Sequence, residues 1–556
     1  MTQIDIFGRV ERWRDSQAFG MLGAQARQRR LRLRPLAARL LDLLPVEHWG
    51  DKAHGRPPWL GIRDIWPGDP AQGATFIGAW GADADALFEL ASDVLPHAHA
   101  FDWLRDLDAA DTAEARAMAY AATRGWLDRY GRWHPLAWRS DLLAHRLAGW
   151  AAHLDLIAAG APDAAAADAI RAALILSARR QLRFLCRTGA ADIDGQPQLG
   201  ALCHGIVAAI ALAPGKTIAA QTTPAAAARL QRWLAAALEV QLHPDGGHVS
   251  RSPTDQFALV CHLAAARAAL ADAVLGVPGW LQHALDKAAP ILRMLRHGDG
   301  RLALFQGSHE GRSGTIDLAL DRSGATGASP TVARHCGYAR IAVGNALLLM
   351  DCGQTGEHAA PLAIELSVGH QRVFVNCGAM ANAGDAWRSA VRATAAHSTL
   401  TVADTNADTR GGGDAQPTLT EHDGAWLLEA SSAGYAPRFG LVHKRSIYCA
   451  ADGQDWRGED VLAPVDAKAQ ERRGYALRFH MHPRIRATLA QDQATVLIRL
   501  PDKSGWRFRV AGGQARLAAS IYVADGETVQ RNEQIVVTGM TGSDGARVRW
   551  ALQRLA

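Results

Sequence analysis

The sequence predicts two domains of different class, an all-helical N-terminal part followed by an antiparallel all-β C-terminal part. A chain of 556 residues is longer than one ordinary core accommodates. Apolar residues recur at helical spacing from about residue 100 to 300, and short β-branched runs bounded by Gly, Asp or Asn follow them. Helices and strands segregated in this way favour two packed domains over a mixed α/β sheet. We place the domains at 1–310 and 311–556, with 1–95 as an irregular or helical lead-in.

The helical half shows regular start and stop signals. One helix is predicted to begin with a capping box formed by Asp111 and Glu114 and to stop at Gly131. The next is predicted to start with Ser140 as its cap and to end at Gly160. Short links between successive helices imply antiparallel hairpins, arranged either as a solenoid or as a closed α/α toroid. Further helices are expected at about 164–187, 199–213, 224–242, 254–275 and 279–297.

The C-terminal half reads as strands. The runs 363–368 (AIELSV) and 372–377 (RVFVNC) are separated by three residues and predict a β-hairpin. Other strand-like runs are 338–350, 398–402, 494–500 and 533–539.

Composition narrows the class of protein. Apolar residues make up 48% and charged residues 21%, as in soluble globular proteins. The net charge is +5 with acids and bases intermixed, which argues against a nucleic-acid-binding protein but suits an anionic partner. Seven cysteines without a C-x-x-C pair indicate reduced thiols. The sequence shows neither a signal peptide nor a membrane span, so we expect a cytoplasmic protein, or a periplasmic one exported by an unrecognised route.

Several polar motifs interrupt the strand-rich half. Residues 387–400 read W-R-x-x-x-R-A-T-A-A-H-S-T-L, preceded by I-E-L-S-V-G and V-N-C-G. Downstream come G-Y-x-x-x-F-G-x-x-H-x-R, W-R-G-E-D at 456–460 and R-F-H-M-H-P. In combination, these motifs resemble the C-terminal module of the heparinase II/III family over most of 330–485. The upstream stretches 101–107 and 245–253 resemble parts of the helical domain of the same family.

The resemblance implies a fold and a reaction. Members of the family pair an α/α toroid with antiparallel β-sheets, which here implies a C-terminal β-sandwich. The implied activity is that of a polysaccharide lyase, which cleaves a uronate-containing acidic glycan, such as a glycosaminoglycan or alginate, by β-elimination. That chemistry needs a group to neutralise the uronate carboxylate, a base for the C5 proton and an acid for the leaving oxygen.

Candidate residues follow from this chemistry. His397 and Tyr435 are candidates for the acid and base, and His248 is the substitute we would test in the helical domain. Arginine binds carboxylates through two parallel hydrogen bonds, which also leaves a structural ion pair as an alternative. The candidate substrate-binding residues are Arg388, Arg392, Arg251, Gln198 and His204.

A zinc site is implied by the same resemblance, because family members can carry a structural Zn²⁺ in the β domain. His397 and His443 would be two ligands, and Asp414 is a third by chain position. Neutral imidazoles and a carboxylate suit Zn²⁺.

One departure from the family leaves other functions open. The family usually carries a Tyr shortly after the Ser-Pro pair, but here Ser252-Pro253 is followed by Thr254. A glycoside hydrolase using Asp245 and Asp255, or a glycan-binding protein with an impaired active site, therefore remain alternatives.

Tryptophans supply faces on which sugars bind, and those in the Gly/Pro-rich segment 55–82 are free to line a cleft: Trp59, Trp66 and Trp80. The expected partner is an acidic polysaccharide or oligosaccharide. A homodimer is also allowed for.

Overall fold

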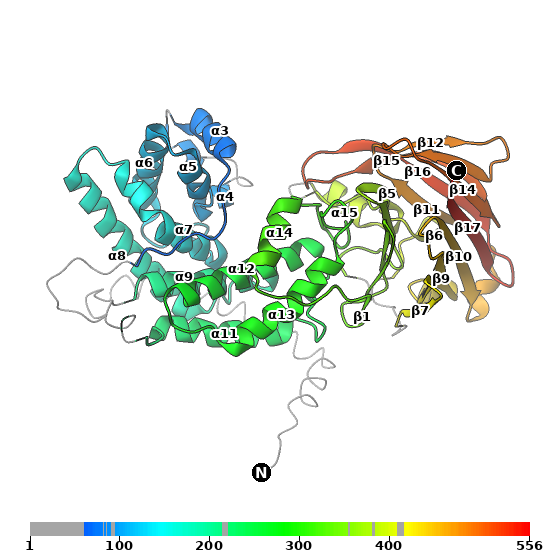
Figure 1. Ribbon diagram of the computed structural model, residues 1–556, viewed down its shortest axis with the longest axis horizontal. Coiled ribbons are helices and arrows are strands. Elements are labelled where there is room, and N and C mark those ends of the chain that lie inside the picture. Colours follow the sequence, from blue (N-terminus) through cyan, green and yellow to red (C-terminus); the bar gives the residue numbers. More distant parts are fainter. Residues whose placement is uncertain are drawn as a thin grey trace, which may run out of the picture. The chain divides into compact units, whose positions relative to one another are not determined.

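A computed structural model describes residues 60–81, 83–84, 86–89, 95–213, 219, 221–353, 356–380, 384–408 and 416–555. The chain divides into two compact units (Figure 1). One comprises Met1–Leu238 and Ala265–Pro278, and the other comprises Glu239–Ala264 and Gly279–Ala556. We describe each unit by itself, the first as the helical unit and the second as the β unit.

The helical unit is built from antiparallel helices whose ends carry local signals. The first described helix, α3, begins with Pro70, and the side chain of Asp69 accepts hydrogen bonds from the backbone N–H groups of Ala71 and Gln72. In the same way, Asp163 caps α8, which stops at Gly189 in a left-handed conformation (φ +63°). The helices are α3 (Pro70–Trp80), α4 (Leu95–Ala100), α5 (Leu104–Ala110), α6 (Ala113–Tyr130), α7 (Ser140–Ala159), α8 (Ala164–Thr188), α9 (Gly195–Ala211) and α11 (Ala225–Gln241).

Two predicted helix caps are wrong by one residue. Thr112, not Asp111, caps α6 by accepting from the N–H of Ala115, while Asp111 pairs with Arg116. Asp111 has φ +47°, because it ends α5 and turns the chain. Ser140 is the first residue of α7 rather than its cap, and its hydroxyl donates to Asp192 Oδ1 at 2.5 Å.

The β unit starts with helices and continues as strands. Helix α12 (Pro253–Asp272) contributes residues to both units, and α13 (Gly279–Met294) and α14 (Ser313–Arg322) precede the first strand. Short helices α15 (Asp385–Arg392) and α16 (Ala436–Phe439) interrupt the strands. The predicted order of a helical domain and an antiparallel β domain is confirmed.

Two antiparallel sheets make up the β unit. The nine-stranded sheet has the order β1-β2-β3-β4-β5-β11-β16-β15, with β6 also paired to β11. Its strands are β1 (Val332–Ala333), β2 (Tyr338–Val343), β3 (Ala346–Asp351), β4 (Ile364–Val368), β5 (Gln371–Val375), β6 (Leu400–Val402), β11 (Gly474–Met481), β15 (Gln514–Tyr522) and β16 (Gln530–Met540).

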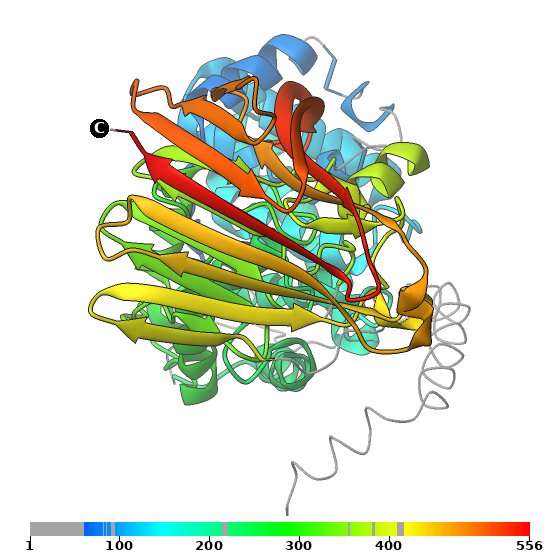
Figure 2. The same ribbon diagram turned by 90° about the vertical axis from the view of Figure 1, so that its right-hand side faces the viewer.

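The eight-stranded sheet has the order β12-β13-β14-β17-β10-β9-β8-β7. Figure 2 shows its strands side by side, with the C-terminal β17 (red) inside the sheet rather than at an edge. The strands are β7 (Thr418–His422), β8 (Ala425–Ser432), β9 (Leu441–Cys449), β10 (Asp455–Pro464), β12 (Arg486–Leu489), β13 (Thr495–Arg499), β14 (Gly505–Ala511) and β17 (Ala546–Arg554).

One hydrophobic core joins the two sheets. It contains side chains from the nine-stranded sheet, such as Leu348 and Phe479, and from the eight-stranded sheet, such as Trp456 and Trp550. Strands of the eight-stranded sheet alternate buried and exposed residues, so its other face carries polar side chains.

The hairpin predicted from 363–368 and 372–377 is confirmed as β4 and β5. The single strand expected at 338–350 is wrong, because Gly344 (φ +56°) turns the chain and splits it into the hairpin β2-β3. All seven cysteines are free thiols. Within the described residues, the helices lack the length and apolar composition of a membrane span.

Candidate functional site

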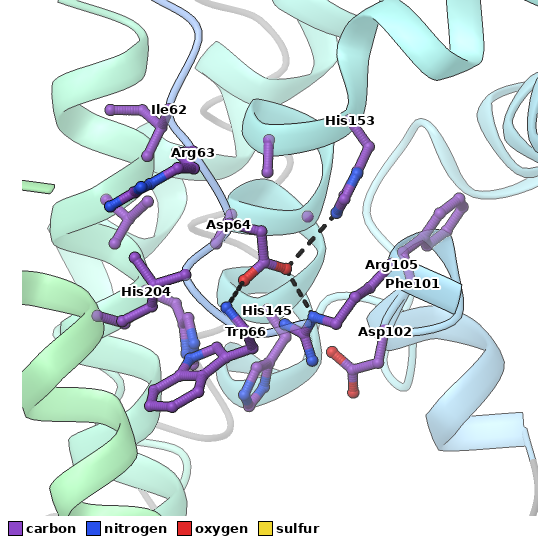
Figure 3. A pocket seen from close by; sticks show the side chains of 16 residues that line it. Ile62, Arg63, Asp64, Trp66, Phe101, Asp102, Arg105, His145, His153 and His204 are labelled. Carbon is purple, nitrogen blue, oxygen red and sulfur yellow. Dashed lines mark hydrogen bonds and ion pairs between the residues drawn. The ribbon is translucent and has the colours of Figure 1, made fainter. Parts of the chain in front are cut away.

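The helical unit contains a pocket with about 540 Å³ of empty space, part of it open to solvent (Figure 3). Five parts of the chain supply its walls: the extended segment before α3, the start of α5, the middle of α7, the second half of α9 and Ala265 of α12. The lining residues that carry its chemistry are Arg63, Asp64, Trp66, Asp102, Arg105, His145, His153 and His204.

Asp64 organises one wall of the pocket. Its Oδ2 accepts from Arg105 Nε at 2.7 Å, and its Oδ1 accepts from the backbone N–H of Trp66 at 2.9 Å. The ring of His153 lies 3.5 Å from the same carboxylate, and Figure 3 shows these three partners around it. Burial raises the pKa of Asp64, but His153 and Arg105 outweigh burial and hold this pKa below its ordinary value. Asp64 is therefore a charged anchor for Arg105.

Two histidines in contact, His145 of α7 and His204 of α9, also line the pocket. Their ring centroids lie 4.1 Å apart at an interplanar angle of 43°. The Nδ1 atom of His145 lies 3.2 Å from the carbonyl of Asp141, and that of His204 lies 2.9 Å from the carbonyl of Gly200. Since a carbonyl only accepts, Nδ1 is the donor in each of these hydrogen bonds.

A cation and an aromatic side chain complete the pocket. Arg63 is exposed and forms no ion pair with any residue that the structure describes. Trp66 is partly buried and lines the pocket, as the sequence suggested for the tryptophans of this segment. Trp80 ends α3, and Trp59 lies outside the described residues.

The residues predicted in the β unit surround the segment that leads into β6. His397 is fully buried, and its Nε2 lies 3.2 Å from Nδ1 of His358. The hydroxyl of Tyr435 donates to the carbonyl of Leu400 at 2.8 Å. Burial raises the pKa of Tyr435 above its ordinary value.

His443 lies on β9 in a buried ion-pair network. Its Nε2 lies 2.7 Å from Asp460 Oδ1, and the same oxygen accepts from Arg445 Nε at 2.7 Å. Arg445 in turn donates to the carbonyl of Ser398, the residue after His397. Tyr435 and Arg445 thus contact the segment that contains His397, and His443 lies two residues before Arg445 on β9. Asp414 lies outside the described residues.

The two candidates of the polar loop before α12 are also buried. His248 Nδ1 lies 2.8 Å from Ser250 Oγ. Burial lowers the pKa of His248, while Asp255 acts in the opposite direction. Arg251 pairs with Asp351 of β3 and donates to the carbonyl of Cys336 at 2.8 Å.

The remaining candidates lie on two helices, Arg388 and Arg392 on α15 and Gln198 and His204 on α9. Arg388 pairs with Asp385 at 2.6 Å within α15, and Arg392 pairs with Glu357; both arginines are about half exposed. Gln198 lies on α9 and donates to the carbonyl of Ala190 at 3.4 Å. Among the residues predicted to bind substrate, His204 lines the pocket of the helical unit.

The sequence reasoning missed His145, His153, Asp64 and Arg105. His145 and His153 both line the pocket from α7, whose backbone departs from helical geometry at His153. Two histidines within one predicted helix are a signal that was available. Asp64 and Arg105 are 41 residues apart, and nothing in their local sequence links them.

Comparisons with known proteins agree with this architecture. A family model described as "Heparinase II/III-like, C-terminal" matches residues 325–551. FtsZ-localized protein C of Caulobacter vibrioides is 30% identical over 545 residues, which cover 90% of this chain and 91% of that protein. The crystal structure of heparinase III matches with a TM-score of 0.66 at 14% identity, covering 84% of this chain and 78% of that one. A heparan sulfate lyase mutant from Pedobacter heparinus matches with a TM-score of 0.63 at 13% identity, covering 94% of this chain and 88% of that one. The two structural matches show the shared fold.

Proposed function

Because this chain belongs to the heparinase II/III-like family, we propose that it is a lyase that cleaves a uronate-containing glycan by β-elimination. The pocket of the helical unit would be the reaction site. One observation carries the proposal: His145 and His204 lie ring against ring in a pocket that also exposes Arg63.

The pocket offers a group for each requirement of the reaction. Arg63 would pair with the uronate carboxylate and so make the C5 proton more acidic. Trp66 would offer its face to a sugar ring. Arg105 is bound to Asp64. Its positive charge would therefore orient the substrate from a distance, without a direct ion pair to the uronate.

His204 is the base in this proposal. Its Nε2 lone pair takes the C5 proton, the C5–H electrons form the C4–C5 double bond, and the C4–O bond breaks. The imidazolium so formed returns the proton to the leaving oxygen, so no co-reactant is needed. His145 lies against this ring and would position it.

The test is turnover of uronate polymers by the full chain. Heparan sulfate, hyaluronan and alginate are each incubated with the protein, and the ultraviolet absorbance of the unsaturated product is followed. We expect His204→Ala to lower kcat by about 100-fold or more on the accepted substrate, and Arg63→Ala to raise KM. His370→Ala, which removes an exposed histidine from the turn between β4 and β5, is the matched control and should leave both unchanged.

Two results would overturn the assignment. Full turnover by His204→Ala would show that the pocket is not the reaction site. New reducing ends without new absorbance would support the hydrolase alternative instead.

A second candidate function is glycan binding without turnover. It is favoured by the 30% identity to FtsZ-localized protein C, whose name gives a location and no enzymatic activity. It is also favoured by Thr254, which stands where the resemblance implies a Tyr. The expected result is then retention on an acidic glycan column, with no absorbance from any polymer, together with co-localisation of a fluorescent fusion with FtsZ.

We also propose that the β unit holds Zn²⁺ through His397 and His443. Each residue is fully buried, and neither Nδ1 atom makes a hydrogen bond within 3.5 Å among the described residues. A buried imidazole nitrogen without a hydrogen bond is the type of ligand that Zn²⁺ takes. When bound, the ion would supply fixed positive charge and a cross-link between β9 and the segment before β6.

A further inference from the structure

The outward face of the eight-stranded sheet carries a shallow groove that crosses the strands. Its lining comes from β8, β9, β10, β17 and β14, and its empty space, open to solvent, is about 990 Å³. The side chains along it form a row in register, each the Cα partner of the next: Leu427, Tyr448, Arg457, Ala551 and Arg509. Four steps between strands of about 4.8 Å give the row a length of roughly 19 Å.

Small residues form the floor of the groove. Ala551 lies between Arg457 and Arg509 in the row, and Ser446 and Ala511 lie in the neighbouring row. Gly458 leaves room for the ring of Trp550, which a Cβ atom at this position would overlap. The buried Trp550 donates to Asp460 Oδ2 at 3.0 Å, so the floor is fixed from below. The groove is therefore a feature of a rigid sheet.

One end of the groove is apolar and partly aromatic. Leu427 and Tyr448 are 36% and 37% exposed. The solvent-facing side of an antiparallel sheet usually carries polar side chains, so two exposed large apolar residues there are unusual. Tyr448 offers a ring face and a hydroxyl, the combination that suits a sugar ring.

The rest of the groove is positively charged. Arg457, Arg509 and Arg549 lie on three adjacent strands, with one acid, Glu459, among them. Glu459 is shared by two arginines, since it accepts from Arg549 Nε at 2.7 Å and from Arg547 at 2.5 Å. Arg509 forms no ion pair with a described residue, although its charge helps to lower the pKa of Asp492. Arg457 pairs with Asp455 at 2.7 Å. With Asp455 and Arg547 included, four arginines face two acids, so the groove keeps excess positive charge.

We propose that this groove is a second binding site, for an acidic oligosaccharide of about four sugar units, separate from the pocket of the helical unit. The glycan lies across the strands, with one sugar on Tyr448 and its carboxylates or sulfates on the arginines. Arginines on neighbouring strands recur at about 4.8 Å, close to the length of one sugar unit. The site requires no turnover, so it holds whether or not the chain is a lyase.

The test is binding of defined oligosaccharides to the full chain. Hexasaccharides of heparan sulfate and hyaluronan, and a neutral cellohexaose, are titrated by calorimetry in the His204→Ala background, which prevents turnover. We expect at least one acidic hexasaccharide to bind and the neutral one to fail. Arg509→Ala should raise the Kd for the acidic hexasaccharide about tenfold, and Tyr448→Ala should raise it by a similar factor. Rising salt should raise this Kd further. Arg486→Ala and Arg499→Ala remove the same charge from the same sheet outside the groove, so each should change Kd less than twofold.

Two other outcomes overturn the proposal. Equal losses for the groove and control arginines would mean diffuse attraction rather than a site. A polyglutamate peptide, or phosphatidylglycerol vesicles, that bind through Arg509 while no glycan does would assign the groove to an acidic peptide or to a lipid surface. If the proposed lyase activity fails while Arg509→Ala still weakens glycan binding, the proposed function is wrong and this site stands.

Discussion

Arg251 and Asp351 form a buried ion pair between the loop before α12 and the end of β3, with only 7% and 1% of their side chains exposed. Gln306 donates to the second oxygen of Asp351 at 2.8 Å, and the hydroxyl of Tyr338 donates to the carbonyl of Arg251 at 2.5 Å. Removal of one partner from a buried pair leaves an uncompensated charge, whereas an exposed pair contributes little.

We therefore expect Arg251→Ala to lower the free energy of unfolding by about 3–5 kcal/mol. Arg388→Ala is the matched control, because its pair with Asp385 is exposed, and it should change stability by less than about 0.5 kcal/mol. Urea unfolding followed by circular dichroism measures both. Unchanged stability of Arg251→Ala together with a raised KM would instead support the substrate-binding role predicted from the sequence.

The sequence predicts what depends on local pattern and misses what depends on contacts distant in sequence. The helices from α6 to α13 and the β4-β5 hairpin follow from apolar spacing and turn residues. The caps at Asp111 and Ser140 fail because several polar residues compete at a helix start, and only packing decides among them. In the pocket, His204 was one of the candidate substrate-binding residues, whereas Asp64 and Arg105 meet only when the chain folds.

His99 should make the helical unit sensitive to acid. It is fully buried and its Nδ1 accepts from Trp126 Nε1 at 3.0 Å. Burial, with the charge of Arg146, lowers the pKa of His99 to about 3. Because the unfolded chain takes up this proton near pH 6.5 and the folded chain only near pH 3, the stability is complete above pH 6.5 and is lost as pH falls below it.

The variant His99→Asn keeps an acceptor near the Nδ1 position and cannot take up a proton in this range. We expect the wild type to lose more unfolding free energy between pH 7 and pH 4.5 than this variant does, by about 1–3 kcal/mol. Urea unfolding followed by circular dichroism at each pH measures this difference. Identical pH dependence of the two proteins would contradict a neutral buried His99.

Tyr435→Phe separates a structural role from a catalytic one. The side chain is 1% exposed, and its hydroxyl donates to the carbonyl of Leu400. Loss of this hydrogen bond should lower the free energy of unfolding by about 1 kcal/mol. Tyr448→Phe, at an exposed tyrosine, is the stability control and should have no effect. Unchanged stability with lost turnover would support the catalytic role predicted for Tyr435.

The zinc proposal makes a prediction that does not depend on activity. After incubation with Zn²⁺ and removal of free metal, the wild type should retain about one ion per chain by elemental analysis, and His397→Ala and His443→Ala should retain almost none. His370→Ala, at the exposed turn, should retain the wild-type amount. Since a metal that binds only the folded state stabilises it, a chelator should lower the Tm of the wild type and of His370→Ala, but not that of the two ligand variants. Because His443 also contacts Asp460, the circular dichroism spectrum of each variant is recorded first, and a folded His443→Ala that keeps its zinc would reject the site.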